Sequence, residues 1–170
     1  AQDKIKALEY QLFLDCRETL LKQLTPLQKM AKAIGVLDGL ASLAMTALSQ
    51  QWVRPEVLDS AVLEIDGGRH PVVEAILPSG EFVDNDARLD DKSHQLIVLT
   101  GPNMAGKSTY IRQVGLIVLL AQMGSFVPAE RARIGIVDRI FTRIGASDDL
   151  AKGESTFMVE MLETAHILHK

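Results

Sequence analysis

The sequence is poor in cysteine, in aromatic residues and in long apolar runs. Its one cysteine, Cys16, excludes an internal disulfide framework and is typical of a reducing compartment; since it lies on the apolar side of a predicted helix, we expect a buried structural thiol. No apolar run approaches the roughly 18 residues of a membrane span, so we predict none. The chain begins without Met or an apolar signal core, and we expect a piece of a longer, cytoplasmic protein.

Positive charge is not in excess either. There are 18 Lys and Arg against 22 Asp and Glu, which gives a formal net charge of −4. This balance argues against a broad nucleic-acid-binding face within these 170 residues, though not elsewhere in a larger protein. His166 and His169 have helical spacing but no further ligands that we can identify, so we predict no metal site there.

A phosphate-binding pattern is present. Residues 101–108 read Gly-Pro-Asn-Met-Ala-Gly-Lys-Ser, which matches G-x-x-x-x-G-K-[ST]. The glycines let the backbone turn tightly, so that successive N–H groups point at phosphate oxygens. Lys107 supplies a positive charge for the β- and γ-phosphates, and Ser108 offers a hydroxyl to Mg²⁺. The pattern therefore predicts a site for a nucleotide and Mg²⁺.

The neighbouring residues suit this pattern. The apolar run Gln95–Thr100 predicts a strand buried on both faces. After Ser108, apolar residues recur at helical spacing as far as a plausible stop at Met123-Gly124. Pro102 removes one N–H donor from the loop, and Ala105 must take a negative φ or accept strain.

Two helices are predicted at the start of the chain. Residues 2–24 carry an apolar stripe. Thr25 can cap a second helix and Pro26 suits its first position, so either one helix ends here and another begins, or a long helix kinks. The second helix carries a heptad-like seam, which favours equally a helix lying on its own domain and a long arm coupling a nucleotide site to something distant. The seam consists of Leu27, Met30, Ile34, Leu37, Ala41, Ala44 and Leu48.

The remaining segments are predicted to be short. We expect His70, next to Pro71, to be a structural hydrogen-bonding residue. The expected elements are a connector over Gln51–Ser60, a strand over Ala61–Ile65, a turn at Asp66–Gly68, a resumed strand at Pro71–Val73, a loop over residues 78–94, two strands at Arg131–Val137 and Arg139–Ile144, a polar loop over Gly145–Glu154 containing Asp148 and Asp149, and a helix capped by Ser155 and running through His169.

Several blocks of sequence carry a resemblance to a known family. They are Gly101–Thr109 with the following Tyr-Ile-Arg-Gln, Gly124–Ala129, Phe141–Leu150, Ser155–Met161 and, in addition, Gly68–Glu74. Through these blocks nearly the whole chain resembles the bacterial MutS family of DNA mismatch-repair proteins. The resemblance implies an α/β fold: a partial core of the P-loop NTPase, ABC-ATPase-like class with an N-terminal long-helix appendage. Residues 1–56 would be the end of the helical lever, and residues 57–170 the N-terminal part of the ATPase domain.

The resemblance also implies a function for the intact protein. Family members bind a mispaired or unpaired base in duplex DNA, use ATP to become a sliding clamp, and recruit a downstream, MutL-like repair factor. Two ATPase domains face each other in a homodimer with nucleotide at the interface. The parts that read the mismatch and form the clamp would lie outside this chain.

The site residues follow from the same resemblance. Asn103 would sit near the γ-phosphate as a catalytic residue together with Lys107, and Ser108 would help hold Mg²⁺. Phe82 and Asn85 match a segment lining the adenine pocket, while Ser155 and Thr156 would reach the γ-phosphate of the ATP on the other subunit. The residues that bind the phosphates would be Gly101, Pro102, Asn103, Met104, Ala105, Gly106, Lys107, Ser108 and Thr109.

On the residues alone, other P-loop classes stay open. A small-molecule kinase would need an Arg-rich lid, and a transporter ATPase a Leu-Ser-Gly-Gly-type signature, where this chain has Gly153–Thr156. A non-hydrolysing nucleotide-binding interaction module is the third alternative. P-loop ATPases use an apolar strand ending in Asp to complete Mg²⁺ coordination, and the sequence shows no such strand. We therefore predict weak nucleotide binding and negligible turnover by this chain alone.

Overall fold

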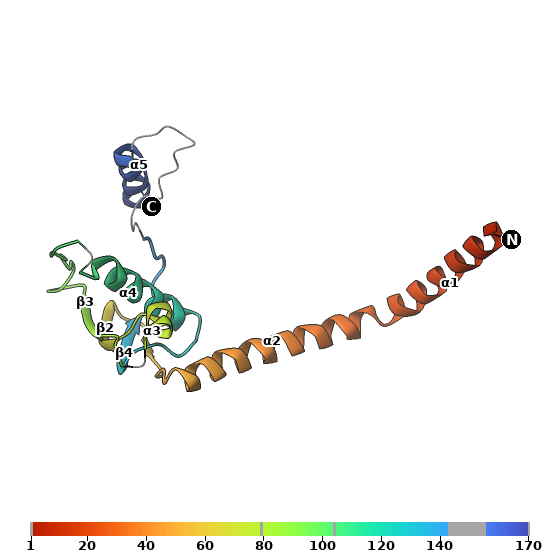
Figure 1. Ribbon diagram of the computed structural model, residues 1–170, viewed down its shortest axis with the longest axis horizontal. Coiled ribbons are helices and arrows are strands. Elements are labelled where there is room, and N and C mark those ends of the chain that lie inside the picture. Colours follow the sequence, from red (N-terminus) through yellow and green to blue (C-terminus); the bar gives the residue numbers. More distant parts are fainter. Residues whose placement is uncertain (1, 79, 104, 143–155, 170) are drawn as a thin grey trace. The chain divides into compact units, whose positions relative to one another are not determined.

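The computed structural model describes residues 2–78, 80–103, 105–142 and 156–169 (Figure 1). The chain forms two compact units, Ala1–Leu43 and Ala44–Lys170. The assignment of residues 1–56 to a lever and 57–170 to an ATPase domain stays a prediction. The helices and strands are α1 (Gln2–Lys22), α2 (Leu24–Ser49), β1 (Glu56–Leu58), β2 (Val62–Gly68), α3 (Pro71–Ile76), β3 (Asn85–Asp90), α4 (Lys107–Gln122), β4 (Arg131–Gly135) and α5 (Thr156–Leu168).

Helices α1 and α2 confirm the two helices predicted at the start of the chain, and only Gln23 separates them. α2 begins earlier than a cap at Thr25 would place it. The backbone N–H of Leu27 donates to the carbonyl oxygen of Gln23 at 3.1 Å, which closes the first helical turn two residues sooner. The predicted seam of α2 is largely exposed, with Leu37 67% accessible.

Cys16 is exposed on α1, so the prediction of a buried thiol is wrong. The apolar stripe on which it was based is present, but α1 has no buried residue. A stripe becomes buried only where another element covers it, and none of the described residues covers this one.

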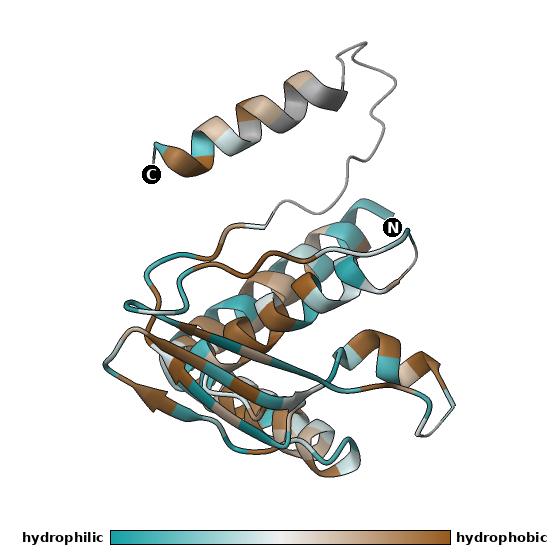
Figure 2. Ribbon diagram, turned by 90° about the vertical axis from the view of Figure 1, so that its left-hand side faces the viewer, coloured by the Kyte–Doolittle hydropathy of each residue, from teal (hydrophilic) through white to brown (hydrophobic). Residues whose placement is uncertain are grey.

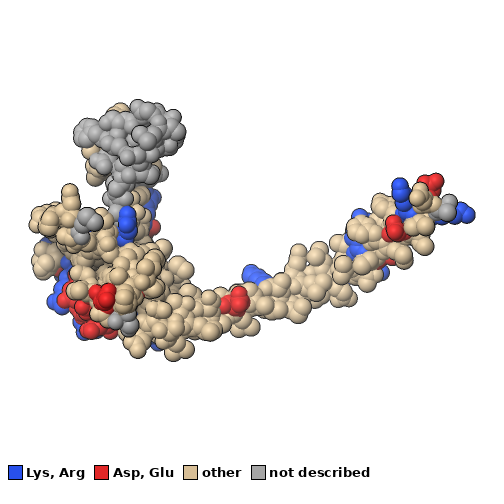
Figure 3. Space-filling model, in the orientation of Figure 1, with Lys and Arg blue, Asp and Glu red and all other residues tan. Residues whose placement is uncertain are grey.

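The second helix, α2, is apolar along much of its length. Its charged residues are few, and Figure 3 shows little charge on the face that it displays. By length and composition alone, α2 could cross a membrane. Helices of soluble proteins pass the same test, so the absence of a membrane span stays a prediction.

A four-stranded mixed sheet with the order β1-β4-β2-β3 forms the framework of the unit Ala44–Lys170. β2 runs antiparallel to β3 and β4, whereas β1 is parallel to β4. Successive side chains of a strand point to opposite faces of a sheet. Figure 2 shows hydrophobic and hydrophilic residues as bands of different colour along the strands. One face buries Ile65, Ala87 and Ile134 in a core shared with α4. The α/β class is thereby confirmed.

The opposite face of the sheet is charged and internally paired. Arg133 on β4 donates to Glu64 on β2 at 2.8 Å and to Glu56 on β1 at 3.0 Å. These two carboxylates raise the pKa of Arg133, with the hydrogen bond that Arg133 donates to Glu64 as the largest cause. Asp66 on β2 likewise accepts from an arginine on each neighbouring strand. Each such ion pair contributes little to the stability of the fold, but together the pairs balance the charges on this exposed face of the sheet.

The segment around β2 departs from its prediction in two places. Asp66–Gly68 is no turn: it belongs to β2 and holds a β-bulge, with Gly67 at φ +58°. A bulge of this kind favours glycine, so the sequence Asp-Gly-Gly is compatible with a bulge as well as with a turn. Pro71–Val73 forms the start of α3 instead of a strand, because His70 caps the helix and Pro71 takes its first position.

Two further strands lie where connectors were predicted. β3 occupies residues 85–90 of the expected loop and pairs with β2, and β1 lies within the expected connector Gln51–Ser60. Both are short strands with polar residues on the open face, which conceals the apolar alternation. β4 confirms the strand predicted at Arg131–Val137 over residues 131–135. Residues 139–142 form no strand, and residues 143–155 lie outside the described part of the chain.

The apolar run Gln95–Thr100 is not a strand in this structure, which corrects its prediction. Leu96 and Val98 are 81% and 74% exposed. A run of consecutive apolar residues needs neighbouring strands and covered faces to form a buried strand. None of the described strands pairs with it: the sheet consists of β1, β4, β2 and β3.

Candidate nucleotide-binding site

The phosphate-binding pattern forms a turn that leads directly into α4. Gly106 is the N-cap residue of α4, at φ +85° and ψ +4°, a left-handed conformation that favours glycine. Among the described residues Gln51 is the only non-glycine residue with positive φ, so Ala105 has the negative φ that the sequence requires. The turn and the helix are therefore as predicted, while Met104 lies outside the described residues.

The side chain of Lys107 folds back over the loop. Its Nζ donates to the carbonyl oxygens of Gly101 and Pro102 at 2.6 Å and 2.5 Å. The ammonium group is thus held at the loop, at the start of α4, where the helix dipole is positive. The two bonds to neutral carbonyls leave its charge available to an anion, because an ammonium carries three donors.

The first turn of α4 provides further groups for an anion. The first N–H groups of a helix have no partner inside the helix, and Gly106 has no side chain with which to cap them. Ser108 is exposed in this first turn, next to Lys107. Backbone donors, one ammonium and one hydroxyl at a helix N-terminus are the groups that bind a phosphate and its magnesium ion.

Helix α4 is firmly attached to the sheet, which fixes the position of the loop. Its buried side chains include Ile117 and Val118 in the shared core. Near its start, the hydroxyl of Tyr110 donates to the carbonyl oxygen of Asp86 on β3 at 2.9 Å. Burial, followed by the charge of Asp86, raises the pKa of the Tyr110 hydroxyl. This link joins the start of α4, just after the phosphate-binding pattern, to β3, although the sequence alone did not single it out.

Phe82 lines a hollow of about 350 Å³. Its role at the adenine base stays a prediction. Asn85 does not line the hollow: its side-chain amide donates to the carbonyl oxygen of Val83 at 2.9 Å. The hollow is lined by Ser49, Gln50, Gln51, Glu74, Ala75, Leu77, Pro78, Gly80 and Phe82.

His70 has the structural role that the sequence predicts. Its Nδ1 accepts hydrogen bonds from the backbone N–H groups of Val72 and Val73, both at 3.3 Å, and so caps α3. The side chain is buried, which lowers the pKa of His70, and the charge of Arg112 on α4 lowers it further.

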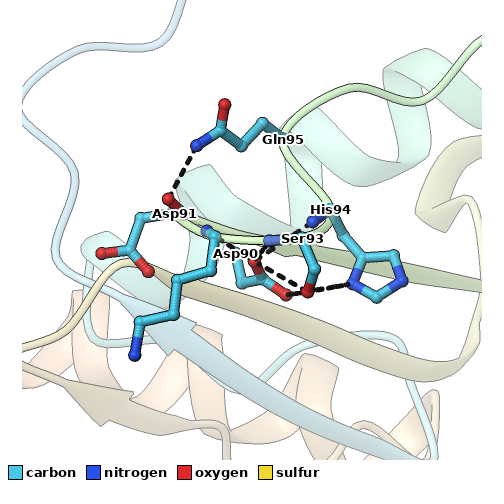
Figure 4. Close-up of polar contacts among 6 residues, drawn as sticks. Asp90, Asp91, Ser93, His94 and Gln95 are labelled. Carbon is cyan, nitrogen blue, oxygen red and sulfur yellow. Dashed lines mark hydrogen bonds and ion pairs between the residues drawn. The ribbon is translucent and has the colours of Figure 1, made fainter.

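A tight turn between β3 and the run 95–100 is organised by Asp90 (Figure 4). The Asp90 carboxylate accepts from the backbone N–H groups of Lys92, Ser93 and His94 and contacts the ring of His94 at 3.0 Å. These contacts, led by the N–H of Ser93, hold the pKa of Asp90 well below its ordinary value. Asp90 ends a strand, but its oxygens already accept from this turn.

No cluster suited to a metal ion occurs within the described ranges: no three His, Cys, Asp or Glu residues lie together there. Mg²⁺ bound with a nucleotide takes several of its ligands from phosphate and water, and P-loop ATPases add a carboxylate from a strand that ends in Asp, so a Mg²⁺ ligand at Ser108 stays a prediction. Of the two residues predicted to reach a nucleotide on another subunit, Thr156 is the first residue of α5, and Ser155 lies outside the described part.

Comparison with known proteins identifies relatives of this chain. The family described as MutS domain V matches residues 97–170. The chain is 55% identical over 168 residues to the DNA mismatch repair protein MutS of Lachnoclostridium phytofermentans, covering 99% of this chain and 18% of that protein. The corresponding proteins of Acetivibrio thermocellus and Carboxydothermus hydrogenoformans are each 56% identical over 99% of this chain. This chain belongs to the MutS family.

The match with the MutS family is close in sequence but covers only part of the length of those proteins. The chain spans about a fifth of the length of these relatives, 18% to 20% of each. The family match covers the phosphate-binding loop, α4, β4 and α5. The alignment over 168 residues extends beyond the family match, so it also includes β1, β2, α3, β3 and the residues that line the hollow beside Phe82.

Proposed function

We propose that this chain binds ATP and Mg²⁺ as part of the ATPase domain, of the P-loop NTPase class, of a DNA mismatch-repair protein. The observation that carries the proposal is the loop before α4, where Gly106 in a left-handed conformation starts the helix and Lys107 is held over the loop by two carbonyls. The family membership supports the same reading.

Within this site each group has a specific role. The loop residues 101–109 would bind the phosphates through backbone N–H groups and Lys107, with Asn103 near the γ-phosphate. Ser108 would give its hydroxyl to Mg²⁺, whose charge offsets that of the phosphates when the ion is bound. Phe82 would contact the adenine base within the hollow, while Asn85 would act beside it by holding the segment through Val83.

In the intact protein, we propose, ATP binding and hydrolysis drive a change from mismatch recognition to a sliding clamp. Two copies would meet through their ATPase domains, with Ser155 and Thr156 reaching the γ-phosphate on the partner. Mismatched duplex DNA would be bound by parts beyond these 170 residues, and a MutL-like factor would act downstream in the cytoplasm. The printed function of the relatives, DNA mismatch repair, supports this proposal.

Replacing Lys107 tests the site directly. Lys107→Ala should weaken the affinity for ATP about tenfold or more, because one charge-assisted contact to phosphate is lost. The measurement is titration of a fluorescent ATP analogue with Mg²⁺. Lys92→Ala, which removes an exposed charge of the same sign from the turn at Asp90, is the control and should leave the affinity unchanged. Equal affinities of the Lys107→Ala variant and the unaltered chain would exclude this site.

Turnover is a separate prediction. We expect negligible ATP hydrolysis by the 170-residue chain, because the acidic carboxylate at the end of a described strand, Asp90, is engaged in its own turn. Steady-state phosphate release is the measurement. Robust release that disappears in the Lys107→Ala variant would show that this chain supplies the missing carboxylate itself.

A further inference from the structure

The C-terminal end of α2 is closed in a conformation that usually requires glycine. Gln51 has a φ of +51°, and the backbone N–H of Trp52 donates to the carbonyl oxygen of Ala47 at 2.9 Å. Together with the bond from Gln51 N–H to the carbonyl of Leu48, at 3.4 Å, this is a Schellman ending. A glutamine at the left-handed position is strained, and such strain persists only where neighbouring groups hold it.

The group that holds this ending is Arg69. Its Nη2 donates to the carbonyl oxygens of Gln50 and Gln51, both at 3.2 Å. Its Nε lies 3.2 Å from Oε1 of Glu74 on α3, and its side chain is only 20% exposed. The backbone N–H of Arg69 donates to the carbonyl oxygen of Pro128 at 2.8 Å, which anchors the residue beside the sheet. One guanidinium thus joins the end of α2 to α3.

The same residues form the hollow that contains Phe82. Gln50 and Gln51 line it from the end of α2, and Glu74 lines it from α3. The second carboxylate oxygen of Glu74 is buried without a hydrogen-bond partner, so the charge of this carboxylate is balanced through Arg69. Any change in the Arg69 contacts therefore changes the lining of the hollow.

We propose that Arg69 is a positioning residue that holds the strained end of α2 in place as part of the base-binding hollow, so that a bound adenine nucleotide stabilises this end of the helix. The inference rests on the proposed function for the nature of the occupant. Coupling of this kind is reciprocal: a ligand that binds the closed ending more tightly also closes it. Loss of Arg69 should then open the ending and uncouple it from the nucleotide.

The first arm of the experiment measures, without nucleotide, how often the C-terminal end of α2 opens. Amide hydrogen exchange is followed by NMR on the ¹⁵N-labelled 170-residue chain at Gln51 and Trp52. In Arg69→Gln the two amides should exchange about tenfold faster, since a charge-assisted hydrogen bond to the ending is lost. Arg88→Gln, which removes an arginine paired with Asp66 on the open face of the sheet, should leave them unchanged. Equal exchange in both variants would overturn the proposal.

A conservative variant keeps this arm interpretable if Arg69→Gln does not fold. Arg69→Lys retains the positive charge beside Glu74 but cannot bridge both carbonyls with the same planar group. We expect it to raise exchange at Gln51 and Trp52 by a smaller factor, about threefold, with sheet amides such as Ile65 still protected. If these two amides of Arg69→Lys exchange as slowly as in the unaltered chain, Arg69 does not hold the end of α2 in the proposed way.

The second arm adds ATP and Mg²⁺ and separates this inference from the proposed function. In the unaltered chain, saturating ATP should slow exchange in residues 101–109 and, several-fold, at Gln51 and Trp52. In Arg69→Gln the protection of the loop should remain while that of the ending is lost. Protection of the loop alone in the unaltered chain overturns the inference but not the function. Protection of neither segment overturns both.

Discussion

His70 is a buried histidine whose neutral ring has a defined role in the structure. Because Nδ1 accepts two backbone N–H groups, the proton of the neutral ring must be on Nε2, and protonation of Nδ1 would break the cap of α3. Burial and then Arg112 place the pKa of His70 below its ordinary value of 6.5 in the folded chain. The unfolded chain therefore takes up a proton first as the pH falls, and the free energy of unfolding should decrease below about pH 6.5.

Replacement of His70 by asparagine tests this dependence. Asparagine is a good helix cap but does not titrate, so His70→Asn should lose less stability than the unaltered chain between pH 7.5 and 5.5. The difference is at most about 1.4 kcal/mol per pH unit, the limit for one proton. Urea unfolding followed by the fluorescence of Trp52, the single tryptophan, is the measurement. The exposed His169→Asn is the control, and matching pH profiles for His70→Asn and the unaltered chain would contradict the role of His70.

At the scale of helices and strands, predictions based on neighbouring residues in the sequence succeeded more often than predictions that depend on contacts between distant residues. The loop before α4 and the cap of α3 rest on local chemistry, namely Gly106 at a left-handed position and His70 before a proline, and the sequence predicted both chemistries. For α3 it predicted a strand all the same, because Pro71–Val73 is apolar and too short for a helical period to show. Local signals thus predicted the turn before α4 and the hydrogen-bonding role of His70 better than the element that follows His70.

Pairing between strands could not be predicted in the same way. β3 contains Arg88 opposite Glu64 and Ala87 opposite Ile65, an arrangement visible only once the partner strand is known. The run 95–100 shows the converse: its sequence suits a buried strand, yet no described strand pairs with it. Arg69 escaped prediction for the same reason, because its partners at Gln50 and Gln51 lie 19 and 18 residues away.

For the molecule as a whole, the most consequential feature is the amount of apolar surface on α2. Ile34 and Leu37 on the seam are 57% and 67% exposed, and α2 has a single buried residue, Ala47. Exposed apolar residues in a heptad pattern are the surface on which helices associate, because burying them against another helix removes them from water. We therefore expect the 170-residue chain to self-associate through α2 in solution.

Sedimentation velocity over a range of protein concentrations measures this association. Leu37→Lys places a charge in the seam and should shift the chain toward the monomer, raising the dissociation constant about tenfold or more, since burial of one leucine side chain is worth roughly 1.5–3 kcal/mol. Val36→Lys is the matched control: Val36 is 54% exposed on α2 but lies off the seam, so the same charge there should leave association nearly unchanged. If both variants dissociate equally, general apolar exposure and not the seam drives association. If neither changes, the copies meet elsewhere, and the heptad pattern of α2 has no part in self-association.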